Sequence, residues 1–158
     1  MRFPINTHHD KKQDKWSGSC TTIRNVTAVG DTFEEMKKNL TAELYSQLNQ
    51  SIDRRAKINI PTNAGDDPDR YIELPFRAII KLKLYEALLK RNISRTTLGV
   101  RMAIKPTQVD QLFDLTHWTR TSTIEAALQV MGFSVNVELI DLDTNPELVF
   151  GEPEYVKS

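Results

Sequence analysis

The sequence predicts an α+β protein, and three patterns lead to that prediction. Short runs typical of strands occupy the chain before residue 30. A long amphipathic stripe begins at Phe33, and several short helical segments follow between Ser94 and Gly132. A turn-rich, acidic stretch, PTNAGDDPD at 61–69, separates the two patterns and is the best linker. We therefore expect an N-terminal domain at 1–60, a linker at 61–69, a second domain at 70–142 and a tail at 143–158.

The first part is expected to have the order strand, strand, strand, helix, strand. Strands are predicted at Arg2–His8, Lys15–Thr22 and Asn25–Val29, with a polar hairpin loop at 11–14. Asp31 or Thr32 should cap the helix, since two glutamates lie in its first turn. Residues spaced by three and four should then cover the sheet: Phe33, Met36, Leu40, Leu44 and Leu48. Ile58 and Ile60 suggest the fourth strand.

The second part is predicted to contain a helix-turn-helix, the motif that lays a recognition helix in a DNA major groove. Ser94 can cap a short helix that presents Leu98 and Met102 inward. Ala103–Lys105 make a break, and Pro106 suits the first turn of the next helix. That helix should bury Val109, Leu112 and Phe113 and expose Thr107, Gln108 and Gln111. A further helix should run from about Ser122 to Gly132.

Charge supports the DNA prediction, because basic and acidic residues are segregated along a chain of zero net charge. Between Phe76 and Arg120 nine Lys or Arg face three acids, whereas from Thr121 onward one Lys faces seven acids. Phosphate neutralisation requires such a basic segment. Asp110 and Asp114 would repel phosphate if they faced the groove. The DNA-binding residues predicted are Arg95, Arg101, Lys105, Thr107, Gln108, Gln111 and Arg120.

Self-association is also expected, as a homodimer or a higher homo-oligomer. Val135, Val137 and Leu139 alternate with polar residues, so Ser134–Leu142 should form a strand with one apolar face. Its predicted partner is Tyr71–Leu74, across a two-fold axis, because a two-stranded ribbon alone is only marginally stable.

Other classes of protein are disfavoured by the composition. Cys20 is the single cysteine, which allows no intrachain disulfide and fits a reducing, cytoplasmic location. No stretch suits a membrane span, and polar residues and Pro4 interrupt any signal-peptide core. No Cys/His cluster has zinc-ligand spacing, and the first strand lacks the acid that a metal-dependent nuclease needs. We therefore expect no enzyme activity, no metal and no cofactor.

The order of these elements and three short sequence motifs within them resemble the HicB antitoxins, in particular members with a C-terminal helix-turn-helix. The motifs are Val29-Gly30-Asp31-Thr32-Phe33-Glu34-Glu35, Ile72-Glu73-Leu74-Pro75 and Leu112-Phe113-Asp114-Leu115. The resemblance implies a partial RNase-H-like N-terminal domain that inhibits HicA, a small basic toxin that cleaves mRNA. It also implies a C-terminal domain that binds double-stranded operator DNA and represses the chain's own operon.

Toxin contacts are expected near the strand ends and the start of the first helix. The acidic candidates, with one aromatic, are Asp10, Asp14, Asp31, Glu34, Glu35 and Trp16. The chain departs from the family at 21–26, which lacks the proline and acid often found there, and at Gly99 and Ala103. One alternative is a stand-alone helix-turn-helix regulator without a toxin. Another is an interaction module that has lost DNA binding.

Overall fold

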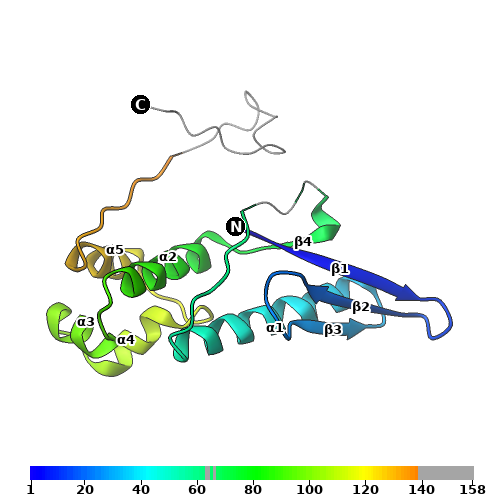
Figure 1. Cartoon of the computed structure of the whole chain (residues 1–158), viewed down its shortest axis with the longest axis horizontal. Coiled ribbons are helices and arrows are strands. Elements are labelled where there is room, and N and C mark those ends of the chain that lie inside the picture. Colours follow the sequence, from blue (N-terminus) through cyan, green and yellow to red (C-terminus); the bar gives the residue numbers. More distant parts are fainter. Residues whose placement is uncertain (63–64, 66, 139–158) are drawn as a thin grey trace.

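The computed structural model describes residues 1–62, 65 and 67–138, and these form an α+β fold (Figure 1). A four-stranded antiparallel sheet has the order β3-β2-β1-β4. The molecule is elongated, with the sheet at one end and helices α2 to α5 at the other (Figure 1). Helix α1 runs along the sheet, and its C-terminal end reaches the helical end. The α+β class predicted from sequence is confirmed.

The first three strands form the expected meander. They are β1 (Arg2–Asp10), β2 (Lys15–Cys20) and β3 (Thr27–Gly30). The β1–β2 hairpin pairs Asp10 with Lys15, and the predicted loop at 11–14 forms its turn. Strand β2 pairs with β3 from Trp16 opposite Gly30 to Ser19 opposite Thr27.

The fourth strand is not where the sequence indicated. Ile58 and Ile60 lie outside any strand, and the fourth strand is β4 (Tyr71–Glu73), which pairs antiparallel with the start of β1. The segment at 57–60 instead crosses helix α2, where Ile58 and Ile60 line a pocket with Leu82 and Leu89. The Tyr85 hydroxyl donates to the Ala56 carbonyl at the start of this segment. The isoleucine alternation therefore reflects packing on a helix and not strand pairing.

Two further expectations fail because β4 belongs to this sheet. Tyr71–Glu73 pairs with β1 of the same chain, and Ser134–Glu138 forms no strand in the described structure. The rest of that predicted strand, 139–142, and the tail at 143–158 lie outside the described residues. Contacts also cross the predicted linker at 61–69. One buried cluster includes Phe3 of β1, Leu44 of α1 and Leu84 of the second part.

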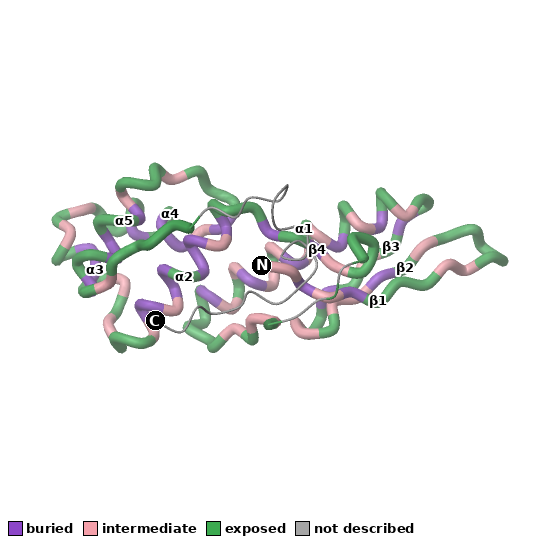
Figure 2. The backbone as a smooth tube through the Cα atoms, turned by 90° about the horizontal axis from the view of Figure 1, so that it is seen from above, coloured by how far each residue is buried: buried purple, intermediate pink, exposed green. Residues whose placement is uncertain are grey.

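Helix α1 (Phe33–Asp53) begins after the N-cap residue Thr32. The Thr32 hydroxyl accepts the Glu35 N–H at 3.1 Å, and the Glu35 carboxylate accepts the Asp31 N–H at 2.8 Å. The predicted stripe is buried from Met36 to Leu48 and extends to Ile52. Buried positions recur along both α1 and α2 (Figure 2).

The helical end contains α2 (Phe76–Lys90), α3 (Arg95–Met102), α4 (Pro106–Phe113) and α5 (Thr121–Val130), and a 3₁₀ turn at Pro68–Arg70 precedes β4. The predicted signals hold, since the Ser94 hydroxyl caps α3 and Pro106 lies in the first turn of α4. Gly99 allows the close approach of these two helices, because an added Cβ would lie 2.9 Å from Val109 Cγ2.

Ala103 ends α3 in the left-handed conformation, with φ 54° and ψ 41°. An alanine costs about 1 kcal/mol there because its Cβ crowds the backbone, whereas glycine does not. We expect Ala103→Gly to raise the free energy of unfolding by up to about 1 kcal/mol in urea titrations. The control is Ala126→Gly on the exposed face of α5, which should lower it by about 1 kcal/mol. A loss of stability in both variants would contradict the explanation.

Candidate nucleic-acid and protein interfaces

Helix α4 presents the polar face that the sequence indicated. Thr107, Gln108 and Gln111 are exposed, while Val109, Leu112 and Phe113 are buried. The Gln108 side-chain oxygen accepts the Lys105 N–H at 2.9 Å, so this amide is already used to close the first turn of α4. In the described part of the chain, the side chains of Thr107 and Gln111 form no hydrogen bond. These two are therefore better placed than Gln108 to reach a ligand.

Arg95 has a different environment from the one expected of a phosphate contact. Its guanidinium lies 3.0 Å from the Asp53 carboxylate of α1 and 3.2 Å from the Asp110 carboxylate of α4. It also lies 5.2 Å from the centre of the Phe113 ring. Asp110 therefore has its charge compensated within the chain, and a phosphate would have to compete with two carboxylates for Arg95.

The other basic residues predicted to bind DNA lie at helix ends on the surface. Arg101 is in the last turn of α3, Lys105 directly precedes α4 and Arg120 directly precedes α5; all three are exposed. None of them forms an ion pair within the described residues. Their side chains can therefore bind phosphate without breaking an internal contact.

Lys81 was counted with the basic segment, but it is buried in α2 with 2% of its surface exposed. Its ammonium group donates to three carbonyls, of Gln111 at 2.8 Å and of Asp114 and His117 at 2.7 Å. Burial lowers the pKa of Lys81 to about 8, although the nearby Asp114 carboxylate opposes this. A buried cation thus binds the carbonyls at the end of α4, where the helix dipole is negative.

Asp114 joins the end of α4 to α1. Its carboxylate accepts hydrogen bonds from the Asn49 amide at 3.1 Å, from the Thr116 N–H at 2.9 Å and from the Thr116 hydroxyl at 2.7 Å. Burial raises the pKa of Asp114, but the bonds from Thr116 and Asn49 and the charge of Lys81 outweigh it and hold the pKa below its usual value. The Asn49 oxygen also accepts the Leu115 N–H at 3.0 Å. Asp114 is therefore engaged internally.

Sequence reasoning missed the structural roles of Lys81 and Asn49. A usable signal existed for Lys81, since it lies three residues after Ala78 and four before Tyr85, both buried. A lysine in phase with an apolar stripe indicates a buried charge that needs partners. No such signal marked Asn49, because its partners lie more than sixty residues away in the sequence.

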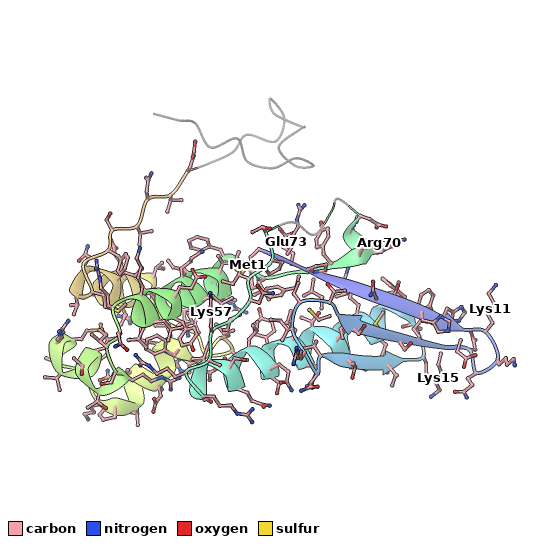
Figure 3. The ribbon with its side chains drawn as sticks, in the orientation of Figure 1. Met1, Lys11, Lys15, Lys57, Arg70 and Glu73 are labelled. Atoms are coloured by element: carbon pink, nitrogen blue, oxygen red, sulfur yellow. The ribbon has the colours of Figure 1, made fainter. Side chains whose placement is uncertain are left out.

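The residues predicted to bind a toxin gather at the hairpin end of the sheet, far from the helical end. Lys11 and Lys15 mark this end in Figure 3. Trp16 stacks on the His9 ring with centroids 4.6 Å apart and meets the Phe33 ring edge-on at 5.2 Å. Trp16 is thus half-buried packing for the start of α1 as well as a candidate contact.

The acids of this end mostly have internal partners. Asp10 accepts the Lys12 N–H, Asp14 lies 3.0 Å from the His9 ring nitrogen and Asp31 lies 3.3 Å from the Lys15 ammonium. The Glu35 carboxylate accepts the Asp31 N–H, and both Glu34 and Glu35 are exposed. Five lysines balance the five acids of this end: Lys11, Lys12, Lys15, Lys37 and Lys38. Charge alone therefore does not make this end acidic.

The sheet face opposite α1 is a second candidate protein surface. A shallow hollow of about 500 Å³ lies along it, and its lining includes the exposed side chains of Asn6, His8, Ser17 and Val29. On the covered face, in contrast, a Cβ at Gly18 would meet the side chain of Met36. The hollow is lined by no Lys, Arg, Asp or Glu and is mostly polar.

Comparison with known proteins decides the family. The family described as HicB_like antitoxin of bacterial toxin-antitoxin system matches residues 2–83, which is more than half of the chain. The chain belongs to this HicB-like antitoxin family. The matched part includes the whole sheet with β4 and the first half of α2. The family resemblance predicted from the sequence is confirmed, and with it a role as the antitoxin of a toxin–antitoxin system.

Similar curated proteins carry the same family name. Antitoxin HicB of Pseudomonas fluorescens (strain Pf0-1) is 29% identical over 124 residues, which cover 78% of this chain and 84% of that protein. Antitoxin HicB 2 of Photorhabdus laumondii subsp. laumondii is 25% identical over 84% of this chain and 91% of its own. Antitoxin HicB of Escherichia coli (strain K12) is 21% identical over 89% of this chain and its full length.

Within 1–62, 65 and 67–138, no three His, Cys, Asp or Glu side chains gather as ligands for a metal ion. Among the helices of that part, none is both long and apolar enough to cross a membrane.

Proposed function

We propose that this family member inhibits a HicA-like mRNA-cleaving toxin and represses its own operon by binding operator DNA. The observation that carries the DNA half is the pair α3 and α4, two eight-residue helices joined by Ala103–Lys105. The second helix has an exposed face of threonine and glutamine, the residue types that reach base edges. This arrangement supports a helix-turn-helix whose recognition helix is α4.

The exposed basic residues are placed to make the phosphate contacts that a recognition helix needs. Arg101 and Lys105 flank the start of α4, and Arg120 lies beyond its end. Basic side chains on both sides of a recognition helix can bind phosphates and hold the helix in register on the duplex. Because Lys81 and Arg95 are engaged internally, these three exposed residues are the phosphate contacts we favour.

Self-association would complete the DNA-binding unit. An apolar groove of about 440 Å³ lies between α2 and the extended segment at 133–137, and Phe76, Val135 and Val137 are exposed along it. We propose that a second copy covers this groove. A two-fold dimer would present two recognition helices about 34 Å apart, one turn of DNA. Light scattering on the full chain at micromolar concentration tests this, and a monomer would contradict it.

The inhibitory half is assigned to the sheet end and to α1. The family match covers this part in full, and two surfaces there are available to a protein partner. One is the hairpin end with Trp16 and Glu34, and the other is the uncovered sheet face. The proposed RNase-H-like character of this part rests on the family, with β4 supplied from beyond the linker.

The experiment for the DNA half measures binding of the full chain to its own promoter and to a shuffled duplex. Gln111→Ala should reduce the discrimination between them by about 1–3 kcal/mol, because a base contact is lost. Arg101→Ala should weaken binding to both duplexes alike and reduce the salt dependence of the affinity, because a phosphate contact is lost. Gln129→Ala, on the exposed surface of α5, is the matched control. Equal binding of the wild-type chain to both duplexes would overturn the DNA half.

A further inference from the structure

The segment between α4 and α5, residues 114–120, is held far more firmly than its loop composition predicts. Lys81 binds the carbonyls of Gln111, Asp114 and His117, which are spaced by three residues along the chain. The Thr119 hydroxyl donates to the Gln111 carbonyl at 3.2 Å, and Asn49 holds Asp114 and Leu115 from the other side. The backbone of this loop is therefore tied to α1, α2 and α4 at once.

Three side chains of the same loop, in contrast, are exposed to solvent. Trp118 is 65% exposed, and His117 and Arg120 are exposed as well. An indole with this much exposed surface, on a backbone fixed by a buried cation, is an ordered aromatic side chain without an internal partner among the described residues. Indole and guanidinium groups are suited to phosphate, sugar and base contacts.

We propose that Lys81 is a positioning residue for DNA binding, which holds the α4–α5 loop so that Trp118 and Arg120 extend the contact surface of α4. The inference rests on the proposed DNA function. The tether needs a charged lysine, since three carbonyls require three N–H groups and a neutral amine has only two. Loss of the proton should therefore release part of the loop.

The electrostatic surroundings of Lys81 set the pH at which this happens. Burial lowers its pKa to about 8. The charged groups that face it are the Asp114 carboxylate, which opposes the shift, and the Arg77 guanidinium, which adds to it. His117 contributes its carbonyl oxygen. The tether is thus intact at pH 7 and weakens as the pH rises through about 8.

The test compares Lys81→Met with Lys38→Met at pH 7. Both variants lose one positive charge from a helix, but Lys38 is exposed on α1, away from α4 and from the groove proposed for self-association. We expect Lys81→Met to weaken promoter binding by about tenfold and Lys38→Met by less than about threefold, as one distant charge would. A folded Lys81→Met that binds like Lys38→Met would overturn the proposal.

A second measurement uses a chain that keeps Lys81, so it tests the proposal even if Lys81→Met does not fold. In a Trp16→Phe background the only indole is Trp118. Its fluorescence without DNA should change with a midpoint near pH 8, and promoter affinity should fall by about tenfold between pH 7 and 9.5. Emission and affinity that stay flat over this range would overturn the proposal. A chain with no promoter preference at pH 7 would overturn the DNA function itself, whereas the Trp118 titration would still report the tether.

Discussion

Replacing Gly30 by alanine should lower the free energy of unfolding by about 3 kcal/mol, the upper end of what overpacking costs. A Cβ at this position would overlap the backbone nitrogen of Met36 and lie 2.9 Å from its Cα. Backbone atoms in the first turn of a capped helix cannot move aside without breaking the bond from the Met36 N–H to the Thr32 carbonyl. The measurement is urea unfolding followed by circular dichroism.

Gly18→Ala is the matched control, because it also adds one methyl group between the sheet and α1. There the Cβ would meet the flexible Met36 side chain, with Leu40 Cδ2 at 3.1 Å. Methionine adapts readily, so a loss of about 1 kcal/mol is expected. Equal losses in the two variants would show that close backbone approach is not why glycine occupies position 30.

The second large effect is expected for Lys81→Met, which removes the ammonium donor from three part-buried carbonyls. We expect the free energy of unfolding at pH 7 to fall by about 3 kcal/mol, because unsatisfied buried polar groups cost more than the bonds contribute. Lys38→Met on the exposed face of α1 should change it by less than about 0.5 kcal/mol, as for other exposed positions. A Lys81→Met variant as stable as Lys38→Met would contradict the role of the three bonds.

A comparison of wild type with Lys81→Met should also show a pH dependence of stability whose sign is known. The pKa of Lys81 is about 8 in the folded chain and 10.5 ordinarily, so between these values the unfolded chain binds more protons. Stability therefore rises with pH in this window for a chain that contains Lys81, although the tether weakens, because loss of the proton removes the cost of burying a charge. The difference in free energy of unfolding between wild type and Lys81→Met should increase from pH 8 to 10. A constant difference would show that Lys81 titrates normally.

Much of the fold could be predicted because its signals are local. The N-cap at Thr32, the stripe after Phe33, the cap at Ser94 and the proline at position 106 each act within one or two turns. The fourth strand could not be placed, because Tyr71–Glu73 pairs with residues at the start of the chain. Ile58 and Ile60 show the alternation of a strand, but they are half-buried beside helix α2.

The candidate site was predictable in outline and not in its contacts. The exposed face of α4 follows from helical spacing, so Thr107 and Gln111 were placed correctly on the surface. Whether a charged residue is available depends on distant partners, which spacing does not show. Arg95 binds Asp53, Lys81 binds carbonyls thirty or more residues away, and Asp114 binds Asn49.

Contacts across the linker also change how the two functions should be separated. A fragment that ends at residue 60 lacks β4, and it would expose the end of α1 that now holds Asp114 and Arg95. Surface variants of the full chain avoid this problem. Gln111→Ala and Arg101→Ala test the DNA half, whereas Glu34→Lys at the hairpin end tests the inhibitory half. The functional division at 61–69 stays a prediction.

Growth rescue tests the central claim most directly. The full chain is expressed in cells together with the product of the small basic reading frame that we expect beside this gene. The wild-type chain and Gln111→Ala should both restore growth, because inhibition does not need DNA binding. Absence of rescue by a folded, abundant wild-type chain would contradict the proposed inhibition of a HicA-like toxin.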